Sequence, residues 1–273
     1  TNQTAHPLEK DALFGPLPLE LAENLRASNP WWSGGEALLP PEFHRWPFPR
    51  LLCLLKTGMT PTTVLRGPRR VGKTVLLAQA IQALLKEGVV GRRILYVAFD
   101  ELPTLRGIQE PVLAIARWFE QCILGETFNR AANEGRPAFL FLDEVQNLDA
   151  WAPQIKNLVD NHGVRALITG SSSLRIEAGR DSLAGRVTTV EMGPLLLREI
   201  AELRFRSTRT SSWGDNGLDQ LVTPEFWQKA VRRGEQDSDL RLTSFAAFSE
   251  RGGYPIAQEK HDTPWHELAD YLN

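Results

Sequence analysis

The chain has 273 residues, of which 42% are hydrophobic and 23% are charged, values typical of a globular protein with a sizeable core. Its 31 basic and 33 acidic side chains balance, which excludes a global positive field for nucleic acid but not a local basic patch. No apolar run approaches the ~20 residues that span a bilayer, and the polar N-terminus lacks the apolar stretch of a signal peptide, so no membrane partner is expected. The two cysteines, Cys53 and Cys122, fit no metal spacing and form no disulfide framework, which favours a reducing, cytoplasmic location.

The first 60 residues form a proline-rich segment that contains Trp31, Trp32 and Trp46. We expect this segment to wrap the edge of a sheet. Tryptophans more often pack than stack on a ligand, so a role in covering a bound base, bordered by residues 47–50, stays open.

Residues 67–74 read GPRRVGKT, the pattern of a phosphate-binding loop. The apolar run 62–66 predicts a buried strand before this loop, and the helical spacing over 75–88 predicts a helix after it. In a strand–loop–helix arrangement, main-chain N–H groups and the positive end of the helix surround phosphate oxygens. The alternative, an ordinary glycine turn with a solvated lysine, is disfavoured by this context.

Within the loop, Lys73 is expected to bridge the β- and γ-phosphates of a nucleotide, and the Thr74 hydroxyl to hold Mg²⁺. Arg69 and Arg70 occupy variable positions of the loop. Their side chains could face solvent, a neighbouring molecule or the γ-phosphate, and these alternatives stay open. The predicted nucleotide-binding residues of the loop are Gly67, Pro68, Arg69, Arg70, Val71, Gly72, Lys73, Thr74 and Val75.

Strands and helices alternate along the rest of the core, which predicts an α/β fold with a five-stranded parallel sheet between helices. Further strands are predicted at 92–100, 138–142, 164–173 and 187–192, with helices at 111–125 and 151–163 and a short helical or turning segment at 174–186.

The apolar strand FLFL ends in Asp143 and Glu144. Because ligands gather at the carboxyl ends of parallel strands, we expect Asp143 to hold Mg²⁺ through water and Glu144 to activate a water for attack on the γ-phosphate. A solvated helix start is the alternative. A glutamate at this position argues against a small-molecule kinase, and the sequence has no N-K-x-D motif for guanine, so ATP hydrolysis is favoured.

The next strand ends in ITGSSS, where the hydroxyl of Ser171 or Ser172 would position the water or sense the phosphate. Serines after a strand are also common turn formers, so both interpretations stay open.

The segments GPRRVGKT, ILYVAFD, FLFLDEVQNL, ITGSSS, SLAGR, PLLLRE and RGGYP occur in this order, with NPWW upstream. In this combination the chain resembles the prokaryotic AAA-type ATPases that carry a C-terminal domain of unknown function, close to the STAND and archaeal ATPase group. The resemblance covers roughly residues 29–271 and implies a P-loop fold of the AAA/ASCE type with a small helical lid. It implies ATP and Mg²⁺ as cofactors, bound by Lys73 and Thr74, and hydrolysis by Asp143 and Glu144. It also implies that Pro255, in the GGYP lid motif, packs near the nucleotide, where the residues alone indicate only a turn.

Three segments are expected: a wrapping segment at 1–60, an ATPase core at 61–200, and an insertion with the lid at 201–273. The polar stretch 206–241 predicts a mobile insertion in which residues 225–233 form one helix. Relatives of this kind usually continue past the lid, so we expect a fragment. A homo-oligomer and a DNA or protein partner of a further C-terminal region both stay open.

Arg186 precedes the last strand, where AAA-type ATPases commonly carry an arginine that acts on the nucleotide of a neighbouring subunit. A helix cap is the alternative. For the whole chain, there are two alternatives to an ATPase that drives a conformational change. One is a nucleotide-dependent switch or scaffold that acts on DNA or a protein partner with slow hydrolysis, and the other is a phosphotransferase.

Overall fold

The computed structural model divides into two compact units. The described residues are 17–35, 39–102, 105, 107–171, 183–207 and 221–272. The sheet unit comprises Thr1–Pro41, Pro47–Gly67 and Lys73–Glu191, and the helical unit comprises Glu42–Trp46, Pro68–Gly72 and Met192–Asn273. The contacts therefore group two short segments from the first part of the chain with its C-terminal third, while the predicted limits at 60 and 200 stay predictions.

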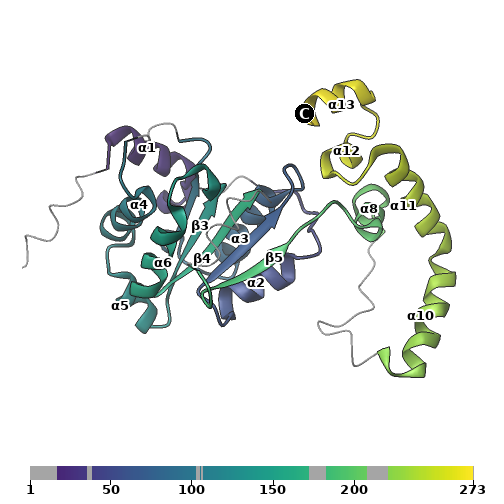
Figure 1. Ribbon diagram of the computed structural model, residues 1–273, viewed down its shortest axis with the longest axis horizontal. Coiled ribbons are helices and arrows are strands. Elements are labelled where there is room, and N and C mark those ends of the chain that lie inside the picture. Colours follow the sequence, from purple (N-terminus) through teal and green to yellow (C-terminus); the bar gives the residue numbers. More distant parts are fainter. Residues whose placement is uncertain are drawn as a thin grey trace, which may run out of the picture. The chain divides into compact units, whose positions relative to one another are not determined.

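The sheet unit is built on five parallel strands in the order β2-β3-β4-β1-β5 (Figure 1). The strands are β1 (Thr62–Gly67), β2 (Ile94–Ala98), β3 (Ala138–Asp143), β4 (Val164–Ser171) and β5 (Val187–Glu191). All six residues of β3 are buried, because a parallel sheet is covered on both faces and its central strands consist of apolar residues. The predicted α/β fold with a five-stranded parallel sheet is confirmed.

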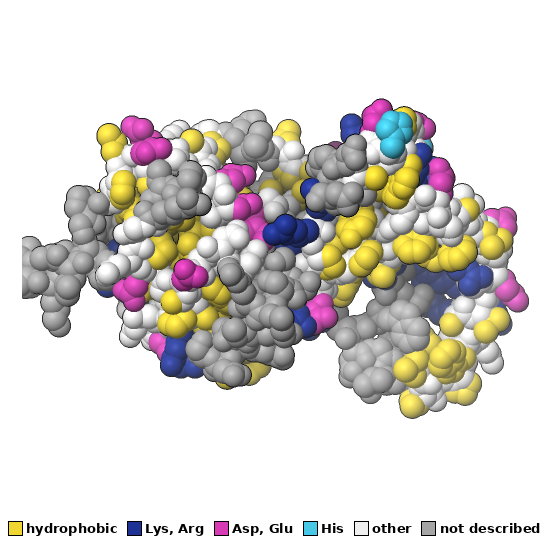
Figure 2. All heavy atoms as spheres, turned by 45° about the horizontal axis from the view of Figure 1, so that its top comes forward, with side chains coloured by type: hydrophobic (Ala, Val, Ile, Leu, Met, Phe, Trp, Pro, Cys, Tyr) yellow, Lys and Arg dark blue, Asp and Glu magenta, His cyan; other side chains and the backbone are white. Residues whose placement is uncertain are grey.

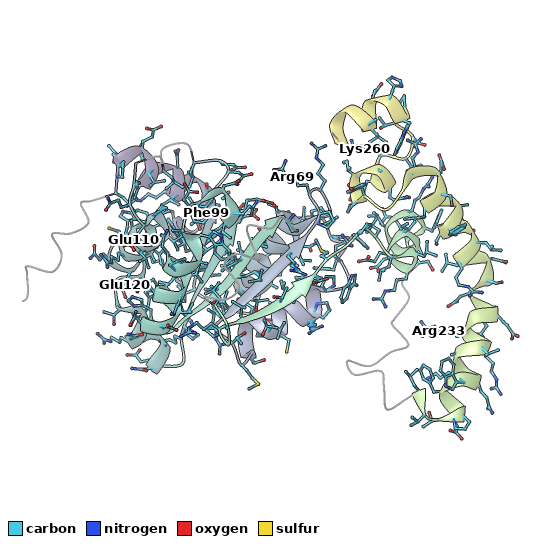
Figure 3. All side chains as sticks on the ribbon, in the orientation of Figure 1. Arg69, Phe99, Glu110, Glu120, Arg233 and Lys260 are labelled. Carbon is cyan, nitrogen blue, oxygen red and sulfur yellow. The ribbon has the colours of Figure 1, made fainter. Side chains whose placement is uncertain are left out.

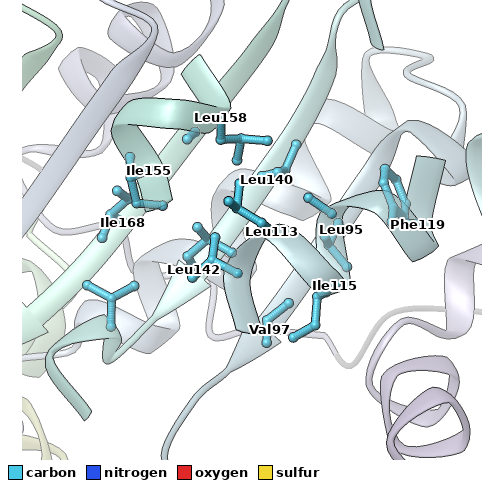
Figure 4. Close-up of a cluster of buried hydrophobic side chains, with 14 of the residues drawn as sticks. Leu95, Val97, Leu113, Ile115, Phe119, Leu140, Leu142, Ile155, Leu158 and Ile168 are labelled. Atoms are coloured by element: carbon cyan, nitrogen blue, oxygen red, sulfur yellow. The ribbon is translucent and has the colours of Figure 1, made fainter. Parts of the chain in front are cut away.

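Helices flank this sheet. Those of the sheet unit are α1 (Leu19–Ser28), η3 (Pro30–Ser33), α2 (Phe48–Thr57), α3 (Lys73–Lys86), η4 (Gly91–Arg93), α4 (Pro111–Phe119), η6 (Glu120–Leu124), α5 (Phe128–Asn133), η7 (Val145–Asn147) and α6 (Trp151–Asn161). Helices α4 and α6 pack on one face, where their leucines and isoleucines meet Leu140, Leu142 and Ile168 (Figure 4). Helices α2 and α3 contact each other, β1 and β4. Each fully buried leucine in these layers contributes about 1.5–3 kcal/mol relative to an exposed one.

The segment before the core lies against the outer edge of β2. The Asn29 side chain accepts a hydrogen bond from the Tyr96 main-chain N at 2.7 Å and donates one to the Tyr96 carbonyl at 2.9 Å. The indoles of Trp31 and Trp32 both donate to the Ile94 carbonyl, at 3.0 and 2.7 Å. Residues 29–32 therefore cover this edge, while the predicted wrapping segment over 1–60 stays a prediction.

The helical unit has a small core of Leu195, Ile200 and Ala247. Its helices are α8 (Leu197–Phe205), α10 (Pro224–Gln236), α11 (Ser238–Arg251), α12 (Pro255–Glu259) and α13 (Trp265–Leu272). Apolar side chains lie at its surface on α10 and α11 (Figure 2), among them Trp227, Val231, Leu242 and Phe245. The helix predicted over 225–233 is confirmed within α10, whereas residues 208–220 of the predicted insertion lie outside the described residues.

Several predicted boundaries shift. The helix predicted over 111–125 is observed as α4 followed by a π-helical turn, η6, that ends at Gly125 with φ +76°. The strand at 92–100 is confined to β2, because Arg92 and Arg93 form part of a 3₁₀ turn. Most of the predicted turning segment, residues 174–182, lies outside the described residues. No described helix combines the length and the apolar composition needed to cross a membrane, and both cysteines are free and exposed.

Candidate functional site

The phosphate-loop sequence joins the carboxyl end of β1, at Gly67, to the first turn of α3, at Lys73. Gly72 has a φ of +96°, a conformation that favours glycine because it has no Cβ. Arg70 also adopts a positive φ, of +64°. The predicted strand–loop–helix arrangement is therefore present.

The loop side chains differ in exposure. Pro68, Arg69 and Arg70 are exposed, as is Thr74 at the start of α3. Arg69 extends outward from the loop (Figure 3). Val71 is fully buried, whereas Val75 is 39% exposed. Contact of these residues with a nucleotide stays a prediction.

Lys73 is buried beneath the loop, with only 4% of the residue exposed. Its ammonium donates a hydrogen bond to the Gly67 carbonyl at 3.3 Å and lies 3.6 Å from Oε1 of Glu144. The Lys73 ammonium is thus held by Gly67 of the phosphate loop and by Glu144 after β3, the two parts of the chain that the sequence predicted to face the phosphates.

Asp143, at the end of β3, is 2% exposed. Its Oδ2 accepts a hydrogen bond from the Thr74 hydroxyl at 2.7 Å, and its Oδ1 accepts one from the Thr169 hydroxyl. Burial raises the pKa of Asp143, although the hydrogen bonds from Thr169 and Thr74 oppose that shift. The predicted pair of magnesium ligands, Thr74 and Asp143, thus meets in space.

These two residues fit Mg²⁺. The ion prefers hard oxygen ligands and is usually held by one or two carboxylates together with phosphates and water. A hydroxyl and a buried carboxylate converge here, and a cation would offset the unfavourable burial of that carboxylate.

Glu144 follows Asp143 with φ +53° and ψ +43°, in the left-handed region, where residues other than glycine are uncommon. Its main-chain N donates a hydrogen bond to the Thr169 hydroxyl at 3.0 Å. Besides the contact with Lys73, its carboxylate accepts a hydrogen bond from the Gln146 amide through Oε2. The unusual backbone turns the chain sharply at the end of β3, next to the loop.

Sequence reasoning missed Thr169, the residue that joins the two acids. It lies within β4, one residue past Ile168, which pairs with Leu142 next to Asp143. A polar residue directly after the apolar run ALI at 166–168, and still within the predicted strand, was the signal that could have indicated it. The predicted Ser171 ends β4, opposite Gly67, and its side chain, like all of Ser172, lies outside the described residues.

Tyr96, on β2, was also missed. Its hydroxyl lies 3.5 Å from Oδ2 of Asp143. Burial, followed by the charge of Asp143, raises the pKa of this phenol. Tyr96 and Trp31 line a cavity of about 350 Å³ that reaches Thr74. Whether the N-terminal tryptophans cover a base stays a prediction.

Arg186 lies at the amino-terminal end of the parallel strands, whereas the phosphate loop follows the carboxyl end of β1. It precedes β5, and its carbonyl accepts a hydrogen bond from the main-chain N of Thr62, at the start of β1. Its guanidinium pairs with Asp160 near the end of α6, with Nη2 2.9 Å from Oδ2. The predicted action of Arg186 on the nucleotide of a neighbouring subunit stays a prediction.

Pro255 begins α12 in the helical unit, and the N-cap residue Tyr254 separates it from the turn at Gly252 and Gly253. Its predicted place near the nucleotide also stays a prediction.

A family model described as an AAA domain matches residues 59–201, more than half of the chain. This chain belongs to the AAA family. The matched region of this AAA domain contains Lys73, Thr74, Asp143, Glu144 and Thr169, and the family supports a nucleotide-binding P-loop ATPase of the prokaryotic AAA type.

Curated relatives of this AAA domain are longer proteins. An uncharacterized protein of Methanocaldococcus jannaschii is 33% identical over 150 residues, covering 53% of this chain and 28% of the relative. An uncharacterized protein of Haemophilus influenzae is 26% identical over 139 residues, covering 50% and 32%. One of Mycobacterium tuberculosis is 27% identical over 220 residues, covering 77% and 41%. The chain spans less than half the length of each of these relatives.

Among solved structures, a Walker-type ATPase of Pyrococcus abyssi matches with a TM-score of 0.46 and 18% identity. The match covers 78% of this chain and 64% of that one.

Proposed function

We propose that this AAA domain binds ATP with Mg²⁺ and hydrolyses it to drive a conformational change. The observation that supports this most directly is the 2.7 Å hydrogen bond between Thr74 and Asp143. It brings the first helical turn after the phosphate loop together with the acidic end of β3, as a site for a metal-bound triphosphate requires.

Lys73 and the loop would bind the phosphates. Main-chain N–H groups of the loop and the N-terminus of α3 attract anions. The Lys73 ammonium, now shared between the Gly67 carbonyl and Glu144, would turn to the β- and γ-phosphate oxygens. This exchange of one anionic partner for another keeps the buried charge compensated.

Thr74 and Asp143 would hold Mg²⁺, which supplies charge stabilisation for the phosphate oxygens when bound. Thr169 would keep the Asp143 carboxylate oriented, since its hydroxyl already donates to Oδ1.

Glu144 would act as the general base. Its carboxylate would accept a proton from a water whose oxygen forms the new bond to the γ-phosphorus, while the bond to the bridging oxygen of ADP breaks. The Thr169 hydroxyl fixes the main chain at Glu144 and so limits where this carboxylate can lie.

A switch with slow hydrolysis is the second candidate. Both oxygens of Glu144 are engaged, one by Lys73 at 3.6 Å and the other by Gln146. A base that must leave two partners before it can orient water favours slow turnover, in which hydrolysis only resets the bound state.

The test compares the parent protein with Lys73→Ala, using Lys86→Ala as a matched control because Lys86 is an exposed lysine in the last turn of the same helix. We expect calorimetry to show MgATP binding by the parent and by Lys86→Ala, and none by Lys73→Ala. Equal affinity in all three proteins would contradict the loop assignment. Phosphate released to water in multiple turnovers indicates an ATPase, slow release with tight retention of ATP indicates the switch, and a phosphorylated acceptor indicates a phosphotransferase.

The setting of this activity is also a proposal. A cytoplasmic location fits the two free cysteines. The proposal includes a homo-oligomer, and a DNA or protein partner bound by regions that the longer relatives possess. The same ATPase assay tests the first by varying the protein concentration and the others by adding DNA or the partner protein.

A further inference from the structure

Arg45 makes contacts that the proposed chemistry does not use. It is 4% exposed and all three guanidinium nitrogens are engaged. Nε lies 2.9 Å from Oε1 of Glu199, and Nη2 donates to the carbonyls of Gly193 and Pro194 at 2.9 and 3.1 Å. The remaining nitrogen, Nη1, donates to the carbonyl of Val71, inside the phosphate loop.

The contact with Val71 bears on the loop's ability to bind anions. In a planar trans peptide the C=O and the following N–H point in opposite directions. Holding the Val71 carbonyl on the Arg45 side therefore directs the Gly72 N–H to the other side of the peptide. Gly72 adopts its φ of +96° at this same peptide, so rotation of the peptide would turn an N–H donor away from the phosphates.

The Nε edge of the Arg45 guanidinium is held by Glu199 of helix α8. Glu199 lies in the first turn of α8, where its Oε2 accepts a hydrogen bond from the main-chain N of Leu196 at 2.8 Å. Its Oε1 accepts another from the main-chain N of Trp46 at 2.7 Å. The position of Arg45 is therefore set by the start of this helix as well as by the loop.

The planar guanidinium suits this double role. One edge meets the carboxylate of Glu199 while Nη1 reaches a carbonyl, which the single point charge of a lysine cannot do at the same time. A buried ion pair can often be replaced by apolar side chains without loss of stability. Stability alone therefore does not explain why an arginine that also bonds the Val71 carbonyl stands at this position.

We infer that Arg45 is a positioning residue that presets the phosphate loop for ATP and links it to α8 through Glu199. This inference rests on the proposed function, since it concerns binding at the same loop. Because coupling is reciprocal, a nucleotide that fixes the loop also stabilises the start of α8, and a change at α8 alters the affinity for ATP.

The first test measures MgATP affinity and steady-state kinetics of Arg45→Lys and of the double variant Arg45→Met/Glu199→Gln. The double variant removes both charges together, while the glutamine oxygen keeps an acceptor for one of the two main-chain N–H groups, of Trp46 and Leu196, that donate to Glu199. We expect Kd and KM to rise about tenfold to hundredfold, the range for one hydrogen bond to a charged group, with kcat nearly unchanged. The matched control is Arg251→Lys, because the Arg251 Nη1 also holds a main-chain carbonyl of the helical unit, that of Thr263 at 2.6 Å, but not a loop carbonyl.

The second test follows hydrogen exchange of the unmodified protein with and without MgATP. We expect ATP to slow exchange in residues 197–205 as well as in the loop, and Arg45→Lys, but not Arg251→Lys, to lose the effect at 197–205. This measurement holds even where a variant fails to fold, since the parent alone must show the protection.

The outcomes separate the two proposals. A parent that does not bind ATP overturns the proposed function, and the inference falls with it. A parent that binds ATP without protecting residues 197–205, or folded Arg45 variants with the affinity of the parent, overturns the inference alone.

Discussion

Thr169 donates a hydrogen bond to Asp143 from the middle of the sheet, and the same hydroxyl accepts one from the main-chain N of Glu144. One side chain on β4 thus holds both acids at the end of β3. Because Thr169 is fully buried, these groups cannot turn to water instead, so the hydroxyl fixes their relative positions.

Thr169→Val should impair both stability and turnover. The change keeps the shape of the side chain but leaves the Glu144 N–H without its acceptor and Asp143 with one donor fewer, at a cost of about 1–3 kcal/mol by urea denaturation. We expect kcat to fall roughly 10- to 100-fold, since the base is no longer held in place. Thr169→Ser should restore most of both. Tyr96→Phe, which removes a hydroxyl 3.5 Å from Asp143, is the control and should have the smaller effect.

Glu144→Gln should keep MgATP binding and lose turnover by about 10²–10⁴-fold, the usual contribution of a general base. The amide is similar in size but cannot accept a proton. Calorimetry and phosphate release measure the two quantities, with Asp149→Asn as an exposed acidic control a few residues away. Hydrolysis at the parent rate would show that another group activates the water.

Asp143→Asn should make the protein more stable at neutral pH when magnesium is removed with EDTA. Burial raises the pKa of Asp143 in the folded state, so ionisation favours the unfolded chain. The parent is therefore least penalised below the ordinary aspartate pKa of about 3.9 and loses stability as the pH rises through the folded pKa.

The asparagine variant lacks this loss. The free energy of unfolding of Asp143→Asn should exceed that of the parent by the least in acid and by more towards neutral pH. The variant should not hydrolyse ATP. A difference that shrinks with rising pH would contradict the assigned direction.

Arg186→Ala should bind ATP and hydrolyse it poorly if the guanidinium acts on a neighbouring subunit, by ~10³–10⁵-fold on the scale of such arginines. Mixing it with Lys73→Ala, which still presents Arg186, should recover activity, and the specific activity of the parent should rise with concentration. Mixing Lys73→Ala with Glu144→Gln is the control and should recover nothing. If no activity returns on mixing, the pairing with Asp160 is the whole role of Arg186.

The sequence predicted those parts of the site that lie within one local pattern. Strand, glycine loop and helix are contiguous, so Lys73 and Thr74 could be placed from residues 62–88. Asp143 and Glu144 could be placed because an apolar run ending in acids indicates where a buried strand stops.

Thr169 and Arg45 could not be placed in this way. Placing Thr169 beside Asp143 required the register between β3 and β4. The serines at the end of the same strand offered other hydroxyls, and the sequence pattern did not distinguish between them and Thr169. Arg45 and Glu199 are 154 positions apart, and an isolated arginine in a proline-rich stretch has no periodic pattern to indicate a buried partner. Contacts between distant segments follow from packing, which local patterns do not encode.

The outer edge of β2 has a consequence for assembly. An edge strand with free main-chain groups invites a strand from another molecule to pair with it. Here the Ile94 carbonyl and both main-chain groups of Tyr96 are already bonded to Asn29, Trp31 and Trp32. Side chains, which cannot themselves be extended by another strand, end the hydrogen-bond ladder at this edge. A strand from another molecule would therefore have to displace these side chains before it could pair with β2 at Ile94 and Tyr96.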